Sequence, residues 1–162
     1  MKTKKKRWPI LAAAGAVLIA AIIIILVLVS HRWRPLKDVP QWSWVREASV
    51  QKIRLRESVT SPDWAVSEDD DLIRSWTDFL SLAEVKRNGL SVHLLPVQGG
   101  GAAVIDLFTD KAQYSIQVYR QDGEDYLVTN GVVYTVKGDA FGLFEQTFKE
   151  ILNRGGAATP WD

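Results

Sequence analysis

Cysteine is absent from the 162 residues of this chain, and histidine occurs only twice. Without a thiol the chain can form no disulfide framework, no cysteine-ligated zinc site, no cysteine nucleophile and no lipid-modified cysteine. The two histidines, His31 and His93, are far apart and lack the HExxH spacing, so they do not build a zinc site by themselves. We therefore expect neither a metal nor a cofactor.

Catalytic motifs are equally scarce. Ser49-Val50-Gln51-Lys52 matches the S-x-x-K string of penicillin-binding enzymes, but it begins an expected strand, where positions i and i+3 point to opposite faces. A Ser-Lys protease of the signal-peptidase kind needs a buried lysine, and the downstream lysines lie in turns, at strand ends or on solvated helix faces. The residues 99–101, three glycines, lack the lysine and helix start of a phosphate loop. We expect no enzyme.

Negative charge is missing from one part of the chain. Residues 1–37 hold eight basic residues and no acidic one, which leaves twelve basic and nineteen acidic residues, a net charge of −7, in residues 38–162. The acidic part has no basic surface for nucleic acid, so nucleic acid is not an expected partner. The basic N-terminus fits membrane topology and contact with anionic lipids, which makes membrane lipid an expected partner.

A long apolar run is the main feature that is present. Ile10–Val29 is a stretch of twenty uncharged residues, and a helix of that length covers roughly 30 Å, the thickness of the hydrocarbon core of a bilayer. A cleaved signal peptide fits less well, because its apolar region has ~7–15 residues and ends at a small-residue cleavage site. The sequence thus predicts a transmembrane signal-anchor over residues 10–30.

Charged and aromatic residues flank this run. The positive-inside rule places the basic tail, residues 1–9, in the cytoplasm and the C-terminal part on the extracytoplasmic side of the cell membrane. Trp8 and Trp33 bracket the run, where indole rings favour the headgroup layer, and Arg32 and Arg34 lie at its far end. We interpret these four as membrane-interface residues.

Two groups of residues are candidates for contact with a partner. Alanine recurs at every fourth position of the apolar run, a spacing that can seat a partner helix: Ala12, Ala16 and Ala20. Residues 31–47 contain two prolines and are predicted to form a short, stiff stalk, in which Trp42 and Trp44 would share one face of an extended chain. These indoles could cover the bottom of the domain, lie on lipid headgroups or stack on a ligand, and the sequence leaves the three alternatives open.

Residues 48–153 combine the period of strands with the period of helices. Strands are predicted over Ser49–Glu57, Leu90–Pro96, Ala102–Thr109, Gln113–Arg120, Tyr126–Thr129 and Val132–Lys137. One helix is expected from a Ser67 N-cap to a close at residues 86–89, with an apolar stripe of Leu72, Trp76, Phe79, Leu80 and Ala83. A second helix is expected between residues 138 and 156. This order predicts an α+β two-layer domain with an antiparallel sheet in a TBP-like arrangement, followed by a flexible tail over residues 154–162.

Within this region a helix, a sheet meander, the segment Tyr126-Leu-Val-Thr-Asn-Gly-Val-Val-Tyr134 and a closing helix follow one another. This pattern, from Ser91 to Leu152, resembles a group of small bacterial envelope proteins of unknown function that are anchored by a lipid or by a single helix. The resemblance implies a similar fold and setting, and it brings no catalytic residues.

Together these features predict a single-pass envelope protein whose outer domain is a non-enzymatic interaction or sensing module for an envelope protein partner. A lipid- or peptide-binding domain with a deep apolar pocket is an alternative, and a hydrolase that uses carboxylates such as Asp106 or Asp110 is a further one. The acidic clusters Glu68–Asp71 and Asp122–Asp125 fit a helix start and a hairpin tip. Calcium binding is the alternative interpretation of these clusters, but both lack the EF-hand spacing of carboxylates.

Overall fold

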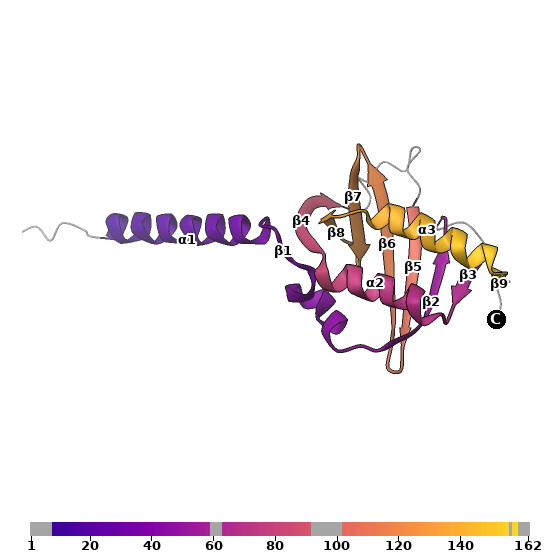
Figure 1. Ribbon diagram of the computed structural model, residues 1–162. Coiled ribbons are helices and arrows are strands. Elements are labelled where there is room, and N and C mark those ends of the chain that lie inside the picture. The colour runs from indigo at the N-terminus through magenta and orange to yellow at the C-terminus, as the bar shows by residue number, and fades with distance from the viewer. Residues whose placement is uncertain (1–7, 59–62, 92–101, 156, 159–162) are drawn as a thin grey trace, which may run out of the picture. The chain divides into compact units, whose positions relative to one another are not determined.

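Figure 1 shows the computed structural model of the chain, which describes residues 8–58, 63–91, 102–155 and 157–158. The chain divides into two compact units, residues 1–32 and residues 33–162. Among the described residues, the first unit contains one helix, and the second contains the sheet and the other helices.

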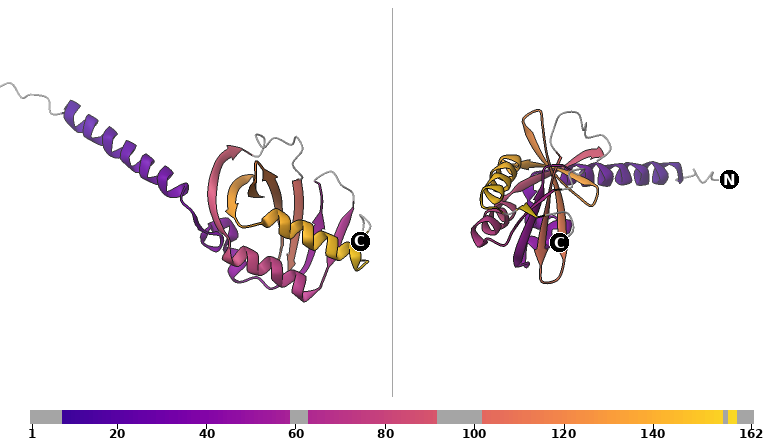
Figure 2. Two further views of the ribbon diagram at one scale, coloured as in Figure 1. Left: turned by 45° about the horizontal axis from the view of Figure 1, so that its top comes forward. Right: turned by 90° about the vertical axis from the view of Figure 1, so that its right-hand side faces the viewer.

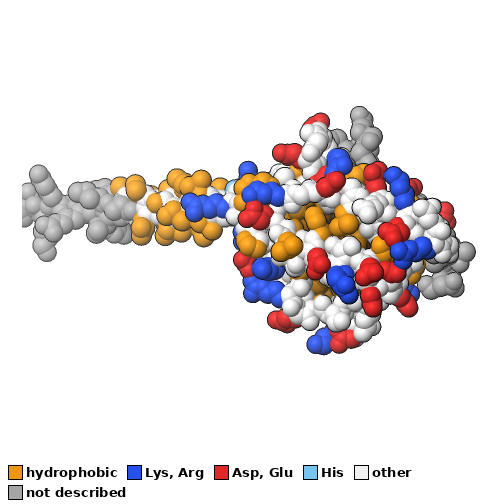
Figure 3. Space-filling model, in the orientation of Figure 1, with side chains coloured by type: hydrophobic (Ala, Val, Ile, Leu, Met, Phe, Trp, Pro, Cys, Tyr) orange, Lys and Arg blue, Asp and Glu red, His pale blue; other side chains and the backbone are white. Residues whose placement is uncertain are grey.

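The helix of the first unit, α1, comprises the 23 residues Trp8–Ser30. Its apolar side chains from Val17 to Val29 are exposed, and they form the apolar surface seen in Figure 3. Within the part of the chain that the structure describes, no helix is long and apolar enough to cross a membrane.

The second unit is an α+β domain, and its described residues form an open antiparallel sheet of nine strands. In chain order these are β1 (Arg34–Pro35), β2 (Val50–Arg56), β3 (Trp64–Ser67), β4 (Glu84–Ser91), β5 (Ala102–Thr109), β6 (Gln113–Gln121), β7 (Glu124–Thr129), β8 (Val132–Lys137) and β9 (Ala157–Ala158). They lie in the order β1-β4-β8-β7-β6-β5-β2-β3-β9. The predicted α+β class and antiparallel sheet are confirmed.

The meander from β5 to β8 fills the middle of the sheet. Its two tightest turns are Asp122-Gly123 and Asn130-Gly131, and all four of these residues have positive φ. Two-residue hairpin turns of this kind require positive φ at both positions, which asparagine or aspartate followed by glycine supplies. The second turn aligns Val128 with Val133. The meander thereby brings β8 alongside β4.

Two helices, α2 (Asp70–Leu82) and α3 (Ala140–Asn153), cover one face of the sheet, as the right-hand view of Figure 2 shows. The predicted apolar stripe of α2 lies in the core or packs against it: Leu72, Trp76, Phe79, Leu80 and Ala83. Phe144 and Ile151 of α3 join the same core. Between the helices the indole Nε1–H of Trp76 donates to Thr147 Oγ1 at 3.1 Å, and both residues are buried.

The predicted limits of α2 were wrong at both ends. The N-cap is Asp69, whose carboxylate accepts hydrogen bonds from the backbone N–H groups of Asp71 (3.0 Å) and Leu72 (3.1 Å), whereas Ser67 had been expected to fill this position. The helix ends at Leu82, and the expected closing residues 86–89 belong to β4. This segment forms a strand rather than a helix end because β8 provides hydrogen-bonding partners for its backbone. Its side chains alternate between the two faces of the sheet, and Val85 is buried in the core.

The strand order also differs from the prediction. Three strands rather than one precede α2. The short strand β1 lies within the expected stalk, and β3 pairs with β2 between the expected turn and the helix. In the expected tail, Ala157 and Ala158 pair with β3 as β9. Of the strand expected over Leu90–Pro96, Leu90 and Ser91 belong to β4, and the remainder lies outside the described residues, as do His93 and the three glycines at 99–101.

Residues 33–47 of the expected stalk belong to the second unit and contribute side chains to its core. They contain two 3₁₀-helices, η1 (Leu36–Asp38) and η2 (Pro40–Arg46). Leu36, Val39 and Trp42 are fully buried, and their spacing of three residues matches the three residues per turn of a 3₁₀-helix. The core therefore begins well before residue 48.

Candidate functional site

The aromatic residues of η2 form a row that runs from the core to the surface. The ring of Trp42 contacts Tyr134 of β8 edge to face, with centroids 6.4 Å apart, and lies 6.2 Å from the ring of Trp44. Trp44 in turn stacks on Tyr114 of β6, with centroids 4.0 Å apart and planes within 9°. Trp42 is fully buried in the core, while Trp44 and Tyr114 are half-buried.

A hollow of about 90 Å³ opens beside the stacked pair. Its walls come from the end of η2, from the turn between β5 and β6, and from β6 itself: Trp44, Glu47, Ala48, Thr109, Asp110, Lys111 and Tyr114. We call this the Trp44 hollow. It brings together two segments about sixty residues apart in sequence because η2 packs across the end of the β5–β6 hairpin.

Hydrogen bonds around Thr109 hold the floor of this hollow in shape. The Thr109 hydroxyl oxygen accepts from the backbone N–H groups of Lys111 (3.2 Å) and Ala112 (3.0 Å). The backbone N–H of Thr109 donates to the carbonyl of Ala112 at 2.9 Å. Backbone groups and the Thr109 side chain therefore close the turn, and the side chains of Asp110 and Lys111 are not needed to stabilise it.

Three charged side chains at the Trp44 hollow make no side-chain hydrogen bond or ion pair with any other described residue. They are Glu47, Asp110 and Lys111, and all three are exposed. Carboxylates accept hydrogen bonds and an ammonium donates up to three, while indole and phenol rings offer apolar faces and edges. The arrangement can bind a polar or charged group that is flanked by apolar surface.

A second hollow lies along α3. It has a volume of about 210 Å³ and is lined by Glu57, Phe141, Phe144, Glu145, Phe148 and Lys149. The rings of Phe144 and Phe148 stack with centroids 5.7 Å apart. We call this the Phe148 hollow. It is larger than the Trp44 hollow, and three phenylalanine side chains make up half of its lining residues.

The carboxylates considered as catalytic residues have different surroundings. Asp106, on β5, is buried, and its Oδ2 accepts hydrogen bonds from Nη2 (2.7 Å) and Nε (3.2 Å) of Arg54 on β2. The Arg54 guanidinium also stacks 4.0 Å from the ring centroid of Trp64. Asp110 lies in the turn at the Trp44 hollow. Asp106 thus holds two strands together through an arginine, and the arrangement does not favour a paired acid and base.

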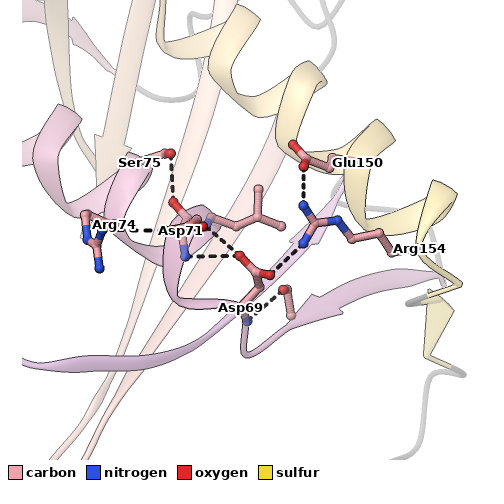
Figure 4. Close-up of polar contacts among 8 residues, drawn as sticks. Asp69, Asp71, Arg74, Ser75, Glu150 and Arg154 are labelled. Atoms are coloured by element: carbon pink, nitrogen blue, oxygen red, sulfur yellow. Dashed lines mark hydrogen bonds and ion pairs between the residues drawn. The ribbon is translucent and has the colours of Figure 1, made fainter.

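The two acidic clusters are used for structure. Asp69 caps α2 and accepts a hydrogen bond from Arg154 (2.6 Å), which also donates to Glu150, so the start of α2 is tied to the end of α3 (Figure 4). In the other cluster Asp125 binds Arg120. In the described segments, no group of three or more carboxylate, histidine or cysteine side chains is placed to hold a metal ion.

The predicted site residues lie in several places. Ala16 and Ala20 are exposed on α1, and the side chains of Trp8 and Ala12 lie outside the described ones. Arg32 is exposed, and Arg34 is half-buried on β1. Trp33 is exposed, with the Lys137 ammonium 4.9 Å from its ring centroid.

The sequence indicated Trp44 as a possible contact residue and Asp110 as a possible catalytic carboxylate, but it did not bring the two together. Tyr114 was expected on a strand, and Lys111 was one of the lysines expected in turns, at strand ends or on solvated helix faces. No local pattern connects them to residue 44, since the contact depends on where η2 crosses the sheet.

Comparison with known protein families, with curated proteins and with solved structures gives no match.

Proposed function

We propose that the protein is a single-pass, membrane-anchored interaction module of the bacterial envelope, non-enzymatic, with the domain on the extracytoplasmic side. We further propose that the Trp44 hollow is the surface by which the domain contacts an envelope protein partner. The TBP-like arrangement of the sheet is part of the same proposal at the level of fold and carries no function with it.

The proposed anchor is supported by the whole apolar run from Ile10 to Val29. The structure describes the side chains of only part of this run. α1 runs through all of these residues without a break. The apolar side chains from Val17 to Val29 are exposed, and twenty uncharged residues match the hydrocarbon thickness of a bilayer. Five basic residues precede the apolar run and three follow it, and this excess on the N-terminal side favours a cytoplasmic N-terminus.

The contact surface is supported above all by the unpaired charges at the Trp44 hollow. Arginine side chains elsewhere in the domain hold carboxylates in ion pairs, as Arg54, Arg120 and Arg154 do. The Trp44 hollow differs, because three charged side chains lie beside its stacked aromatic pair: Glu47, Asp110 and Lys111. These side chains make no hydrogen bond or ion pair with other described residues. A partner that binds there satisfies these groups without breaking any contact of the fold.

Site-specific photocrosslinking in native membranes tests this surface. A benzophenone amino acid replaces Lys111 in the full-length protein, and a matched variant carries it at Ser75, an exposed position on α2. We expect a discrete crosslinked partner from position 111 that is lost when Glu47→Gln and Asp110→Asn are added. Equal crosslinking from both positions, or a crosslink unaffected by those substitutions, would contradict the assignment of the hollow.

The location is tested with the same site. Because the chain has no cysteine, Lys111→Cys gives one thiol, which a membrane-impermeant maleimide labels from the extracytoplasmic side only if the domain lies there. Labelling only after the cells are lysed would overturn the proposed topology. Recovery of a mature protein that begins beyond Ser30 would overturn the anchor.

The Phe148 hollow favours a second candidate function, the binding of an apolar peptide side chain. Its volume of about 210 Å³ suits one large side chain rather than a lipid tail. Phe148→Ser would weaken the partner's crosslink if this hollow holds it, and would leave the crosslink unchanged if the Trp44 hollow does.

A further inference from the structure

Two exposed apolar side chains of the domain, Trp33 and Leu82, lie at one edge. In the described part of residues 33–158, three large apolar side chains are well exposed: Leu82 at 80%, Leu152 at 44% and Trp33 at 41%. Isolated exposed leucines are ordinary on protein surfaces. Leu82 and Trp33, however, flank the same short stretch of structure, where β1 meets β4 and the end of α2.

Backbone contacts join these two residues through their neighbours. The Leu36 N–H donates to the Ala83 carbonyl at 2.8 Å, one residue from Leu82. Arg34 pairs with Val85 in the sheet, one residue from Trp33. Trp33 and Leu82 are therefore on one continuous edge of the domain rather than on separate surfaces.

Cations accompany the apolar residues at this edge. Lys37 is exposed next to Leu36 and has no carboxylate partner among the described residues. The Lys137 ammonium lies 4.9 Å from the centroid of the Trp33 ring, with Glu84 as its ion-pair partner. We call Trp33, Lys37, Leu82 and Lys137 the tether edge. Two of its four residues are lysines, although residues 33–162 carry fourteen basic and nineteen acidic residues, a net charge of −5.

The chain itself limits how far this edge can be from α1. Trp33 follows Ser30, the last residue of α1, by three residues, and three extended residues span roughly 10 Å. If α1 is anchored in a bilayer, Trp33 cannot lie more than about that distance from the end of the anchor. Indoles, leucines and lysines that lie so near a bilayer partition into its interface, the rings and chains into the headgroup layer and the ammonium groups onto phosphates.

We propose that the tether edge binds the surface of the membrane in which the protein is anchored, with Leu82 and Trp33 in the headgroup layer and Lys37 and Lys137 on lipid phosphates. This inference rests on the proposed anchor. It fixes which side of the domain faces the lipid.

Fluorescence quenching on the full-length protein in vesicles tests the proposal. Leu82→Cys and the matched control Leu152→Cys each create a single thiol, because the chain has no other, and each is labelled with bimane. The vesicles contain phosphatidylcholine and phosphatidylglycerol with a fraction of lipid spin-labelled at the headgroup. We expect several-fold stronger quenching at position 82 than at position 152. Equal quenching at the two positions would overturn the proposal.

Two further arms separate lipid binding from simple nearness and from failure of the anchor. A flexible Gly-Ser segment inserted between Arg32 and Trp33 should leave the quenching at position 82 largely intact, and its loss would show that the chain only holds the edge nearby. Lys37→Glu with Lys137→Glu should reduce the quenching in phosphatidylglycerol vesicles by more than in pure phosphatidylcholine. A protein that does not float with the vesicles at all would refute the anchor, whereas flotation without selective quenching would refute the tether edge alone.

Discussion

The two ends of α3 and the Trp44 hollow hold charged side chains in opposite ways. At the ends of α3 each arginine binds two carboxylates: Arg120 binds Asp125 and Asp139, and Arg154 binds Asp69 and Glu150. At the hollow the charges have no such partners within the described residues. Figure 3 shows acidic and basic side chains mixed over the face that carries the helices. The paired charges orient elements of the fold, and the unpaired ones are available to a partner.

The two paired clusters are themselves unequal. Asp125 is 4% exposed and accepts hydrogen bonds from Arg120 Nε (2.6 Å), Arg120 Nη2 (2.9 Å) and the Phe141 N–H (2.9 Å). Asp69 is more exposed, and its pKa is lowered chiefly by the hydrogen bond from the Leu72 N–H. The first cluster lies under the start of α3 and the second at the surface, so the first should matter far more to stability.

Asp125→Ala is expected to have the largest effect. The substitution leaves the Phe141 N–H without an acceptor and removes one of the two carboxylates of Arg120, whose side chain is 38% exposed and keeps Asp139. The loss of three hydrogen bonds at a buried carboxylate, discounted for the exposure of Arg120, should cost about 3 kcal/mol. Chemical denaturation of the full-length protein in detergent measures the loss. Asp78→Ala, at an exposed position of α2, is the control and should change the free energy of unfolding by less than about 0.5 kcal/mol. A loss below about 1 kcal/mol for Asp125→Ala would place this pair among the weak surface pairs.

Such a buried pair was not visible in the sequence, although much of the fold around it was. Periodicity predicted the stripe of α2, and the strands β5 and β8 have the predicted limits. The hairpin turns followed from Asp122-Gly123 and Asn130-Gly131, because local sequence decides positive φ. Asp125 was read as part of a solvated hairpin tip, and only the packing of α3 over β7 buries it.

The errors share a cause as well. Residues 84–91 carry charges typical of a helix end, yet they form β4, because the neighbouring strand β8 offers hydrogen bonds that a lone segment does not have. Trp42 was expected in an extended stalk, yet it is fully buried in a 3₁₀-helix. In both cases a tertiary contact decides the local conformation. The Trp44 hollow was missed for the same reason, since Trp44 and Tyr114 meet only through the fold.

Thr147→Val should have the next largest effect on the free energy of unfolding. It tests a buried hydrogen bond between two uncharged side chains. Thr147 Oγ1 accepts from the Trp76 Nε1–H at 3.1 Å and donates to the Leu143 carbonyl at 2.7 Å. Valine keeps the shape but leaves the buried indole N–H without an acceptor, which costs about 1–3 kcal/mol. Thermal unfolding measures it. Thr77→Val, at a less buried site on α2, should cost clearly less, and an equal cost would mean that the interhelical hydrogen bond adds nothing.

The pH dependence of stability separates the clusters further, with a smaller effect. The pKa of Asp139 is lowered, mainly by the hydrogen bond from Arg120 and then by the bond from the Gly142 N–H. A carboxyl whose pKa is lower in the folded state stabilises the protein above its unfolded pKa, about 3.9, and this contribution is lost as the pH falls through the folded value. We expect the melting temperature to fall below about pH 4. Asp139→Asn should flatten this fall, whereas Asp78→Asn should leave it as in the unchanged protein.

Glu47→Gln, Asp110→Asn and Lys111→Gln, combined, should have the smallest effect on stability and the largest on partner contact. Each residue is exposed and unpaired among the described residues, so the free energy of unfolding should change by no more than about 0.5 kcal/mol. Denaturation measures that change, and crosslinking from Ser75 and from Ala48, which also lines the hollow, measures the contact. Loss of the crosslink at position 48 in a fully stable protein would separate the two regions by role. A clear loss of stability would instead mean that these charges take part in the fold as the arginine clusters do, and the contrast between the two regions would collapse.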